Sequence, residues 1–307
     1  MTLKNVLASF YFLMVLVSCK ESSTPPTNQF RQQWYAGKAE LTSYTLQQAR
    51  YSEMRNGEAV LIFVTEDFST DDLVKLDEPE RTSNKARVLK MNMTKKFVTG
   101  IYPYSMMLSV FTPVTADGNK KTLKATCSSQ EWCGHTFSQL QLKGNHYNWQ
   151  LYSYFEKEGE QDKKLYAALL EDELWNRIRI NPSNLPQGKV ALIPGLLWQR
   201  LSHFEMQKED AVLTLSKADT FFTKDTSVQL YTIYYRQLQR TLQIYFKPNF
   251  PHEILGWQES YPDGFGSSKK MLTTKAIRKK TIWSDYWNHN KVTDSSYRDS
   301  LQLMPYE

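Results

Sequence analysis

The chain is built largely of short segments in which apolar and polar residues alternate, joined by tight turns. Alternation at every second residue predicts β-strands with one buried face. Asn56-Gly57 predicts a hairpin turn between the first two strands, because both residue types readily adopt positive φ, and Gly144 with Asn145 predicts another. Strands that follow one another through short turns pair antiparallel. The clearest segments are residues 39–51, 58–68, 104–113, 134–142, 146–155, 204–216, 228–236, 241–248, 253–261 and 270–283.

One segment in the middle of the chain has helical spacing instead. Apolar side chains recur at three- and four-residue intervals over residues 165–180, and Pro182 marks the end of this helix. A short terminal helix is expected over 295–303. We therefore predict a β-rich fold, all-β to α+β, in which about ten antiparallel strands form a sandwich or a partly open barrel around one central helix. Residues 34–160 and 190–307 then form two halves joined by that helix.

The N-terminus indicates where the protein resides. Lys4 is followed by an apolar run over residues 6–17, which has the length of a signal-peptide core and is too short to span a membrane. The run ends in Leu-Val-Ser-Cys (16–19), which resembles a bacterial lipobox. In a lipobox the cysteine receives a diacylglyceryl group, and the small residues before it let a lipoprotein signal peptidase cut the chain.

These residues predict a lipoprotein signal peptide over 1–18, lipidation of Cys19, a flexible tether over 19–33 and a β-rich body over 34–307. The tether is expected because the residues after Cys19 are rich in Ser, Thr, Pro and Gln. Lys20 stands where an aspartate would retain a lipoprotein in the inner membrane, so we expect the outer membrane, on its periplasmic face or at the cell surface. Several acyl chains, such as palmitate, anchor a protein stably, so the membrane is an expected partner.

The charge and the aromatic content of the chain limit the classes of partner, other than the membrane, that the sequence predicts. The 38 Lys and Arg residues and 32 Asp and Glu residues give a net charge of +6 that is too dilute to predict nucleic-acid binding. The chain has 18 Tyr, 15 Phe and 8 Trp, which either fill a large β core or line a groove for a lipid, a glycan or an envelope protein. The candidates for lining such a groove are Trp257, Tyr261, Trp283 and Trp287.

The stretch CSSQEWCGHTF (127–137) contains the two remaining cysteines. Cys127 and Cys133 can form a disulfide if the residues between them turn tightly, because the bond needs Cα atoms within about 7 Å. If the stretch is one extended strand, the sulfurs lie roughly 20 Å apart and both thiols stay free. A thioredoxin-like site is not expected, because its second cysteine and its helix are absent.

Strand alternation gives this stretch a further interpretation. In one strand, Glu131, Cys133 and His135 point to the same face, which would place a carboxylate, a thiol and an imidazole in a row. Such a row is a candidate nucleophile dyad or metal half-site. The alternative is that Cys133 is a small buried side chain and His135 an ordinary polar one. Because no zinc-protease spacing, phosphate loop or GxSxG motif occurs, we predict no cofactor and no metal site.

Three segments, WYAGKAELTSY (34–44), FVTGIYPYSMM (97–107) and SSQEWCGHTF (128–137), resemble a family of uncharacterised lipoproteins of Bacteroidota. The resemblance covers nearly the whole chain after the signal peptide. Members often carry the label septum formation inhibitor Maf, which implies a nucleotide pyrophosphatase. The Maf motif LASxSPRR is matched here only by Leu-Ala-Ser at 7–9, and the motif GADT only by Ala-Asp-Thr at 218–220.

The sequence thus predicts a lipoprotein with a non-enzymatic binding or structural role in the cell envelope. The rival is a thiol-dependent or hydrolytic enzyme centred on Cys133 and His135, which requires both side chains within hydrogen-bond reach in a cleft. The pyrophosphatase that the family label implies is a third possibility.

Overall fold

The computed structural model describes residues 26–115, 120–218 and 227–305. The first half contains eight strands: β1 (Ala39–Arg50), β2 (Glu53–Ser69), β3 (Lys85–Thr99), β4 (Tyr102–Pro113), β5 (Lys124–Glu131), β6 (Gly134–Lys143), β7 (His146–Ser153) and β8 (Gln161–Tyr166). The second half contains seven: β9 (Leu169–Leu170), β10 (Gly188–Ile193), β11 (Glu209–Lys217), β12 (Gln229–Tyr235), β13 (Arg240–Phe246), β14 (Ile254–Asp263) and β15 (Lys270–Ser284). The helices are α1 (Asn28–Trp34), α2 (Glu173–Ile180), α3 (Leu196–Ser202) and α4 (Tyr297–Ser300), with 3₁₀ turns at Pro79–Arg81, Pro182–Asn184, Gly266–Ser268, Tyr286–Asn288 and Val292–Ser296.

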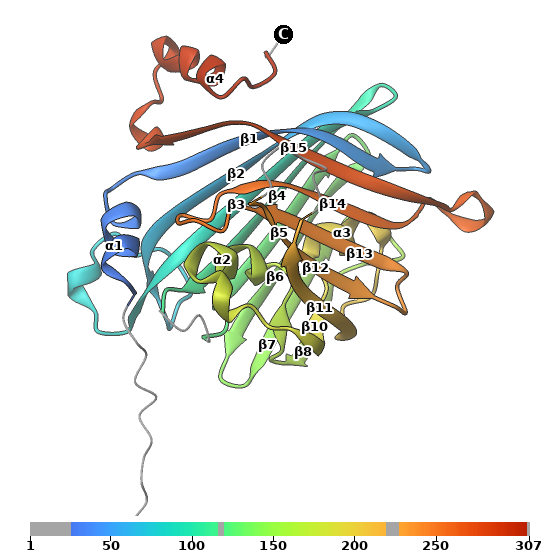
Figure 1. The fold of residues 1–307 in the computed structure, drawn as a ribbon. Coiled ribbons are helices and arrows are strands. Elements are labelled where there is room, and N and C mark those ends of the chain that lie inside the picture. The colour runs from blue at the N-terminus through green and yellow to red at the C-terminus, as the bar shows by residue number, and fades with distance from the viewer. Residues whose placement is uncertain (1–25, 116–119, 219–226, 306–307) are drawn as a thin grey trace, which may run out of the picture.

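All of these strands belong to one sheet, whose order runs from β8 down to β1 and then from β15 down to β9 (Figure 1). Two meanders therefore share the sheet, and they meet where β1 pairs antiparallel with β15. The prediction of a β-rich fold is confirmed. The count of about ten strands was wrong, because fifteen strands of the described chain hydrogen-bond into one continuous sheet. The division of the body into two halves stays a prediction.

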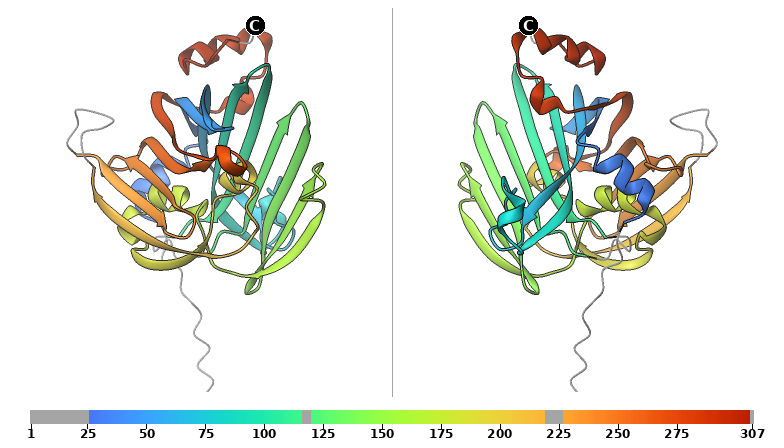
Figure 2. Two further views of the ribbon diagram at one scale, coloured as in Figure 1. Left: turned by 90° about the vertical axis from the view of Figure 1, so that its right-hand side faces the viewer. Right: turned by 90° about the vertical axis from the view of Figure 1, so that its left-hand side faces the viewer.

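The two outer edges of the sheet come together at one corner. β8 ends at Tyr166 and β9 begins at Leu169, so the two edge strands are at most about 11 Å apart there along the chain. The backbone N–H of Ala167 in this short link donates to the carbonyl of Asn145, at 2.9 Å. The sheet is therefore curled into two wings that face each other, and Figure 2 shows these wings from two sides.

Helix α2 fills the space between the wings, and every one of its residues is buried. The side-chain amide of Asn176 donates to the carbonyl of Leu89 at 3.0 Å and to Thr112 at 2.9 Å, which fastens α2 to β3 and β4. The guanidinium of Arg179 forms a buried ion pair with Glu40 on β1. Polar contacts as well as apolar packing therefore hold the helix inside the sheet.

The predicted helix over 165–180 was too long. Residues Gln161–Tyr166 extend the sheet as β8, Leu169–Leu170 form β9, and the helix begins only at Glu173. The apolar residues of this region belong first to strands and then to helix α2, so the helical spacing before Glu173 was accidental. A second helix, α3, packs against β4 and β5.

Asn56-Gly57 does not form the first hairpin turn. The turn is at Tyr51 and Ser52, whose φ values are 59° and 62°, and Gly57 lies inside β2 opposite Leu46. A Cβ atom at Gly57 would lie only 2.2 Å from the carbonyl oxygen of Lys96 on β3. Glycine is needed there for close strand packing, whereas the turn predicted at Gly144 (φ 62°) is confirmed.

The ordered body starts earlier than predicted. Helix α1 begins at Asn28, inside the range expected for the tether, and its Phe30 and Trp34 are buried. The ring of Trp34 packs against Trp283 of β15 at 5.0 Å between centroids. The predicted signal peptide and Cys19 lie outside the described residues.

The last described residues, 285–305, cross the outer face of the sheet over β1, β2 and β15, and we call them the C-terminal strap. Leu301 packs with Leu41 and Val64, which covers an apolar part of that face. The carbonyl of Leu301 accepts a hydrogen bond from Ser43, and the N–H of Met304 donates to Glu58 at 2.8 Å. The strap includes the predicted terminal helix as α4 and a 3₁₀ turn.

Candidate functional site

A cleft of about 650 Å³ opens at one end of the sheet. We call this end of the sheet the cleft rim. Its walls come from the end of β1, from β4, from the β5–β6 turn, from the β7–β8 loop, from the end of α3 and from the β14–β15 loop. These segments are far apart in the sequence and meet only because the sheet curls. A concave site of this size is typical of small-molecule binding.

Aromatic side chains form much of the cleft wall. Tyr51, Tyr104, Phe155 and Phe265 line it, and the rings of Tyr51 and Phe265 lie 6.0 Å apart. Tyr104 is buried, whereas Phe265 is 54% exposed at the mouth. The hydroxyl groups of Tyr51 and Tyr104 share a hydrogen bond of 2.7 Å. The cleft therefore offers flat apolar surface with two polar atoms at its inner wall.

Arg50, the last residue of β1, lies in this inner wall and is only 3% exposed. Its Nη1 donates to the carbonyl of Leu201 at 2.6 Å, and its Nη2 lies 3.2 Å from the hydroxyl of Tyr104. Its guanidinium lies 4.1 Å from the centroid of the Tyr51 ring. Burial raises the pKa of Asp263 and the charge of Arg50 acts to lower it, but within the described ranges no carboxylate forms an ion pair with Arg50. The buried Nε of Arg50 has no hydrogen-bond partner.

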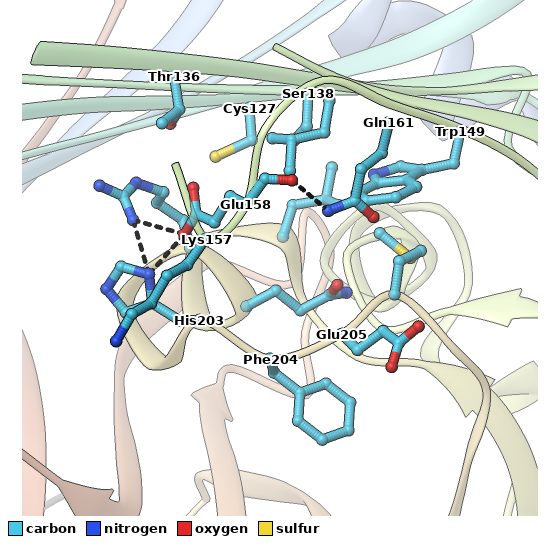
Figure 3. Close-up of a pocket in the computed structure, with 15 residues that line it drawn as sticks. Cys127, Thr136, Ser138, Trp149, Lys157, Glu158, Gln161, His203, Phe204 and Glu205 are labelled. Carbon is cyan, nitrogen blue, oxygen red and sulfur yellow. Dashed lines mark hydrogen bonds and ion pairs between the residues drawn. The ribbon is translucent and has the colours of Figure 1, made fainter. Parts of the chain in front are cut away.

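A second cavity of about 260 Å³ adjoins the cleft, and we call it the inner chamber (Figure 3). One side is formed by inward-facing side chains of β5, β6, β7 and β8, and the other by α3 and the residues that follow it. Its apolar lining consists of Cys127, Trp149, Leu151, Leu196, Phe204 and Met206. The chamber therefore lies between the wing that ends in β8 and helix α3.

Glu158 separates the two cavities. Its carboxylate accepts from the hydroxyl of Ser153 at 2.5 Å. It also lies 2.5 Å from Nδ1 of His203 and pairs with Arg200 at 3.3 Å (Figure 3). We call this contact between the β7–β8 loop and α3 the Glu158 latch. Burial raises the pKa of Glu158, but hydrogen bonds from His203 and Ser153 and the charge of Arg200 outweigh it, so the pKa lies below its ordinary value. Lys157, Glu158, Arg200 and His203 line both cavities.

A buried charge cluster lies deeper, between the helices and β13–β14, around a void of about 30 Å³. Arg240 pairs with both oxygens of Glu171, at 2.5 and 2.6 Å, and with Glu259 at 2.7 Å. Lys95 and Asp172 also line this void. Burial raises the pKa of Asp172 to about 7, helped by the negative charge of Glu171, although the N–H of Leu196 donates to its carboxylate.

The structure separates the predicted nucleophile dyad. β5 ends at Glu131 and β6 begins at Gly134, so Trp132 and Cys133 form a turn and the stretch is not one strand. The turn breaks the alternation, and His135 is exposed on the face opposite its inward-facing neighbour Thr136. Cys133 and Glu131 line the cleft, but His135 does not.

The environment of Cys133 does not activate its thiol. A hydrogen bond to Glu131 and the negative charge of that carboxylate raise the pKa of Cys133. The same carboxylate accepts from the backbone N–H of Cys133 at 2.7 Å, which fixes it beside the thiol. A nucleophilic cysteine needs the opposite, a neighbouring positive charge that stabilises the thiolate.

Of the two alternatives for Cys127 and Cys133, the structure has no disulfide between them, and both thiols are free. Cys127 is buried and pairs with Ser138, four residues before the last pair of the hairpin. At about 3.3 Å per residue, roughly 13 Å of strand separates it from the turn that holds Cys133. Burial raises the pKa of Cys127 to about 12, so this thiol is inert in the folded protein.

Glu131→Gln is expected to speed the alkylation of Cys133 severalfold near neutral pH. The substitution removes the charge that disfavours the thiolate, and an amide oxygen can still accept from the backbone N–H of Cys133. Rates are measured with iodoacetamide, and peptide mass mapping separates Cys133 from Cys127. Glu53→Gln, on an exposed residue elsewhere at the rim, is the matched control. An unchanged alkylation rate in Glu131→Gln would contradict the conclusion that Glu131 raises the pKa of Cys133.

The four aromatic residues predicted to line a groove do not share one. Trp257 and Tyr261 are buried in the core, Trp283 packs against Trp34, and Trp287 is 44% exposed on the C-terminal strap. The aromatic residues that line the cleft were not singled out, since nothing in the sequence brings β1, β4 and two distant loops together. The stretch over 127–137 was the signal near this site, since its Glu131 and Cys133 do line the cleft.

No group of three or more His, Cys, Asp or Glu side chains is arranged to hold a metal ion within the described ranges. No helix in those ranges is both long enough and apolar enough to cross a membrane. Asp219 and Thr220 of the partial Maf motif lie outside the described residues.

No family model matches the chain, and no curated protein matches it. Among solved structures, it is similar to the crystal structure of a beta-barrel-like protein of domain of unknown function DUF1849 from Brucella abortus. The two share 8% sequence identity with a TM-score of 0.46, over 80% of this chain and 97% of that chain. This likeness carries no information on ligand or activity.

Proposed function

We propose that the protein is a non-enzymatic binding protein of the cell envelope, which holds a small molecule with an anionic group and an apolar body in the cleft. One observation carries the proposal. The buried guanidinium of Arg50 stands in an aromatic wall of the cleft with a carbonyl and hydroxyl groups as its partners. Its charge is thus left for a ligand to neutralise.

The energetics of burial support an anion at this position. A buried charge is unfavourable unless it is paired, and arginine in proteins stays protonated, so it cannot escape by losing its proton. An anionic ligand in the cleft would supply the missing charge. The cleft is lined by four cations, Arg50, Lys157, Arg200 and Lys269, and by three carboxylates, Glu131, Glu156 and Glu158, and this small positive excess would attract an anion.

Binding is favoured over catalysis by what the lining residues already do. The thiol of Cys133 has a raised pKa, and the imidazole of His203 is engaged with Glu158. A nucleophile with a neighbouring base is the minimum for covalent catalysis, and Cys133 and His135 do not supply it.

The lipobox residues over 16–19 support attachment to the outer membrane, and the fold then sets the direction of the cleft. Helix α1 lies at the start of β1, and Arg50 lies at its other end, about 40 Å away for twelve extended residues. Figure 1 shows α1 and the loop that joins β14 to β15 at opposite ends of the sheet. A protein anchored through its N-terminus would therefore present the cleft away from its own membrane.

Arg50→Met is expected to weaken binding of 1-anilinonaphthalene-8-sulfonate at least tenfold. This probe carries one sulfonate on an aromatic body, and tenfold equals about 1.4 kcal/mol, at the lower end for a hydrogen bond to a charged group. Fluorescence titration measures the affinity, with circular dichroism to confirm folding.

Arg87→Met is the matched control, because Arg87 is paired with Asp67 near the opposite end of the sheet and does not line the cleft. It is expected to bind the probe as the unmodified protein does. Equal affinity in Arg50→Met and Arg87→Met would overturn the proposal. If Arg50→Met does not fold, Arg50→Lys is used, and a change in its probe affinity is again the expected result.

A further inference from the structure

We infer that the cleft and the inner chamber form one binding site for a fatty-acid-like amphiphile, with its anionic head beside Arg50 and its hydrocarbon chain in the chamber. The inference rests on the proposed function and names the class of ligand. It is carried by the contact between two cavities of about 650 and 260 Å³ that share the wall residues of the Glu158 latch.

The two cavities differ in the way that an amphiphile requires. The cleft has Arg50 in its inner wall and Lys157 and Lys269 in its lining, and it opens at the rim. The deep walls of the chamber are buried apolar side chains, among them Leu196, Met206 and Cys127. An apolar cavity of about 150 Å³ already admits benzene, so the chamber has room for a longer segment of hydrocarbon.

Charged side chains also line the chamber, and several of them are already paired: Glu158 with Arg200 and His203, and Glu205 with Lys163. Two glutamines of the lining are engaged as well. The amide of Gln161 donates to the carbonyl of Glu158 at 2.7 Å (Figure 3). The amide of Gln199 donates to the carbonyl of Pro194 at 2.5 Å. Hydrocarbon can lie against such groups without breaking their hydrogen bonds. The indole N–H of Trp149 is buried and has no partner within the described ranges.

The Glu158 latch lies between the proposed positions of the ligand's anionic head and of its hydrocarbon chain. Its bonds join side chains of the β7–β8 loop to Arg200 and His203 at the end of α3. These contacts involve side chains, so their rotation connects the chamber with the cleft without unpairing any strand. A chain that enters from the rim therefore passes Glu158 before it reaches Trp149 and Leu151.

A series of straight-chain carboxylates from butanoate to dodecanoate tests the inference. Titration calorimetry of the whole protein is expected to show affinity rising by up to about fourfold for each added methylene until the chamber is full. Ser138→Trp, which places an indole in the chamber from the inner face of β6, is expected to abolish this gain for the longer acids. Gln139→Trp adds the same side chain on the outer face and is expected to leave the gain unchanged.

The outcomes separate the two proposals. If affinity does not rise with chain length, or if Ser138→Trp and Gln139→Trp behave alike, the inference is overturned while the anion site at Arg50 stands. If neither the naphthalene sulfonate nor any carboxylate depends on Arg50, the proposed function itself fails. Should Ser138→Trp not fold, Ser138→Leu replaces it, and a shorter preferred chain is then the expected result.

Discussion

Arg240→Met is expected to lower the free energy of unfolding by about 3–5 kcal/mol, the usual effect of removing one partner from a buried ion pair. Arg240 is 1% exposed and holds Glu171 and Glu259 between the helices and the sheet. Without it, two buried carboxylates stand close together beside Asp172, with Lys95 as the remaining cation that lines the void. Chemical denaturation followed by tryptophan fluorescence measures the change.

Two further variants define what this result means. Arg236→Met, on an exposed residue of the same β12–β13 hairpin, is expected to change stability by no more than about 0.5 kcal/mol. Glu171→Gln added to Arg240→Met is expected to recover part of the loss, since it removes one of the unpaired charges. A loss under about 1 kcal/mol in Arg240→Met would contradict a stabilising role for the cluster.

Asp172→Asn is expected to remove a pH dependence from the stability of the protein. The cluster contains two cations, Lys95 and Arg240, and two carboxylates that balance them, Glu171 and Glu259. Asp172 is the fifth charged group, and burial with the charge of Glu171 raises its pKa from 3.8 to about 7. Its carboxyl is therefore protonated in the folded protein over a pH range in which it is ionised in the unfolded chain.

The sign follows from this difference. Between about pH 4 and pH 7 the folded state holds a proton that the unfolded chain has released, so the free energy of unfolding falls as pH rises, by up to about 4 kcal/mol. Asp172→Asn is expected to match the unmodified protein below that window and to exceed it in stability above pH 7. The amide oxygen can still accept from the N–H of Leu196.

Denaturation at a series of pH values compares the two proteins, and Asp210→Asn, on an exposed carboxylate, controls for the general effect of lost charge. The difference between Asp172→Asn and the unmodified protein isolates this one group from the other titrating residues. A difference that stays constant from pH 4 to pH 8 would show that Asp172 titrates alike in the folded and unfolded states.

The strands were predictable from sequence because each is recognised locally, by alternation and by its turns. The partners of the strands were not, because the pairing of β1 with β15 joins Ala39 to Ser284 and leaves no local pattern. Gly57 illustrates the same limit on a smaller scale. Its sequence context indicated a turn, but its real constraint is the carbonyl of Lys96 on a neighbouring strand.

The candidate site was predictable only in fragments. The stretch over 127–137 was recognised as unusual, and Glu131 and Cys133 do line the cleft. Arg50 could not be recognised, because an arginine at the end of a strand is ordinarily exposed, and its burial depends on Leu201 of a helix 151 residues further along the chain. The site is assembled by the curl of the sheet, which no single segment encodes.

The pairing of β1 with β15 also has a consequence for how the chain folds. Each meander can form from contacts between neighbours in sequence, which is fast, but the central pair of the sheet joins residues more than 200 positions apart, such as Leu46 and Ala276. Until β15 has been synthesised, one edge of the twelve-residue strand β1 is open to pairing with other chains. A chain cut short before Lys270 therefore keeps that edge exposed and is expected to aggregate, even though most of its strands are present.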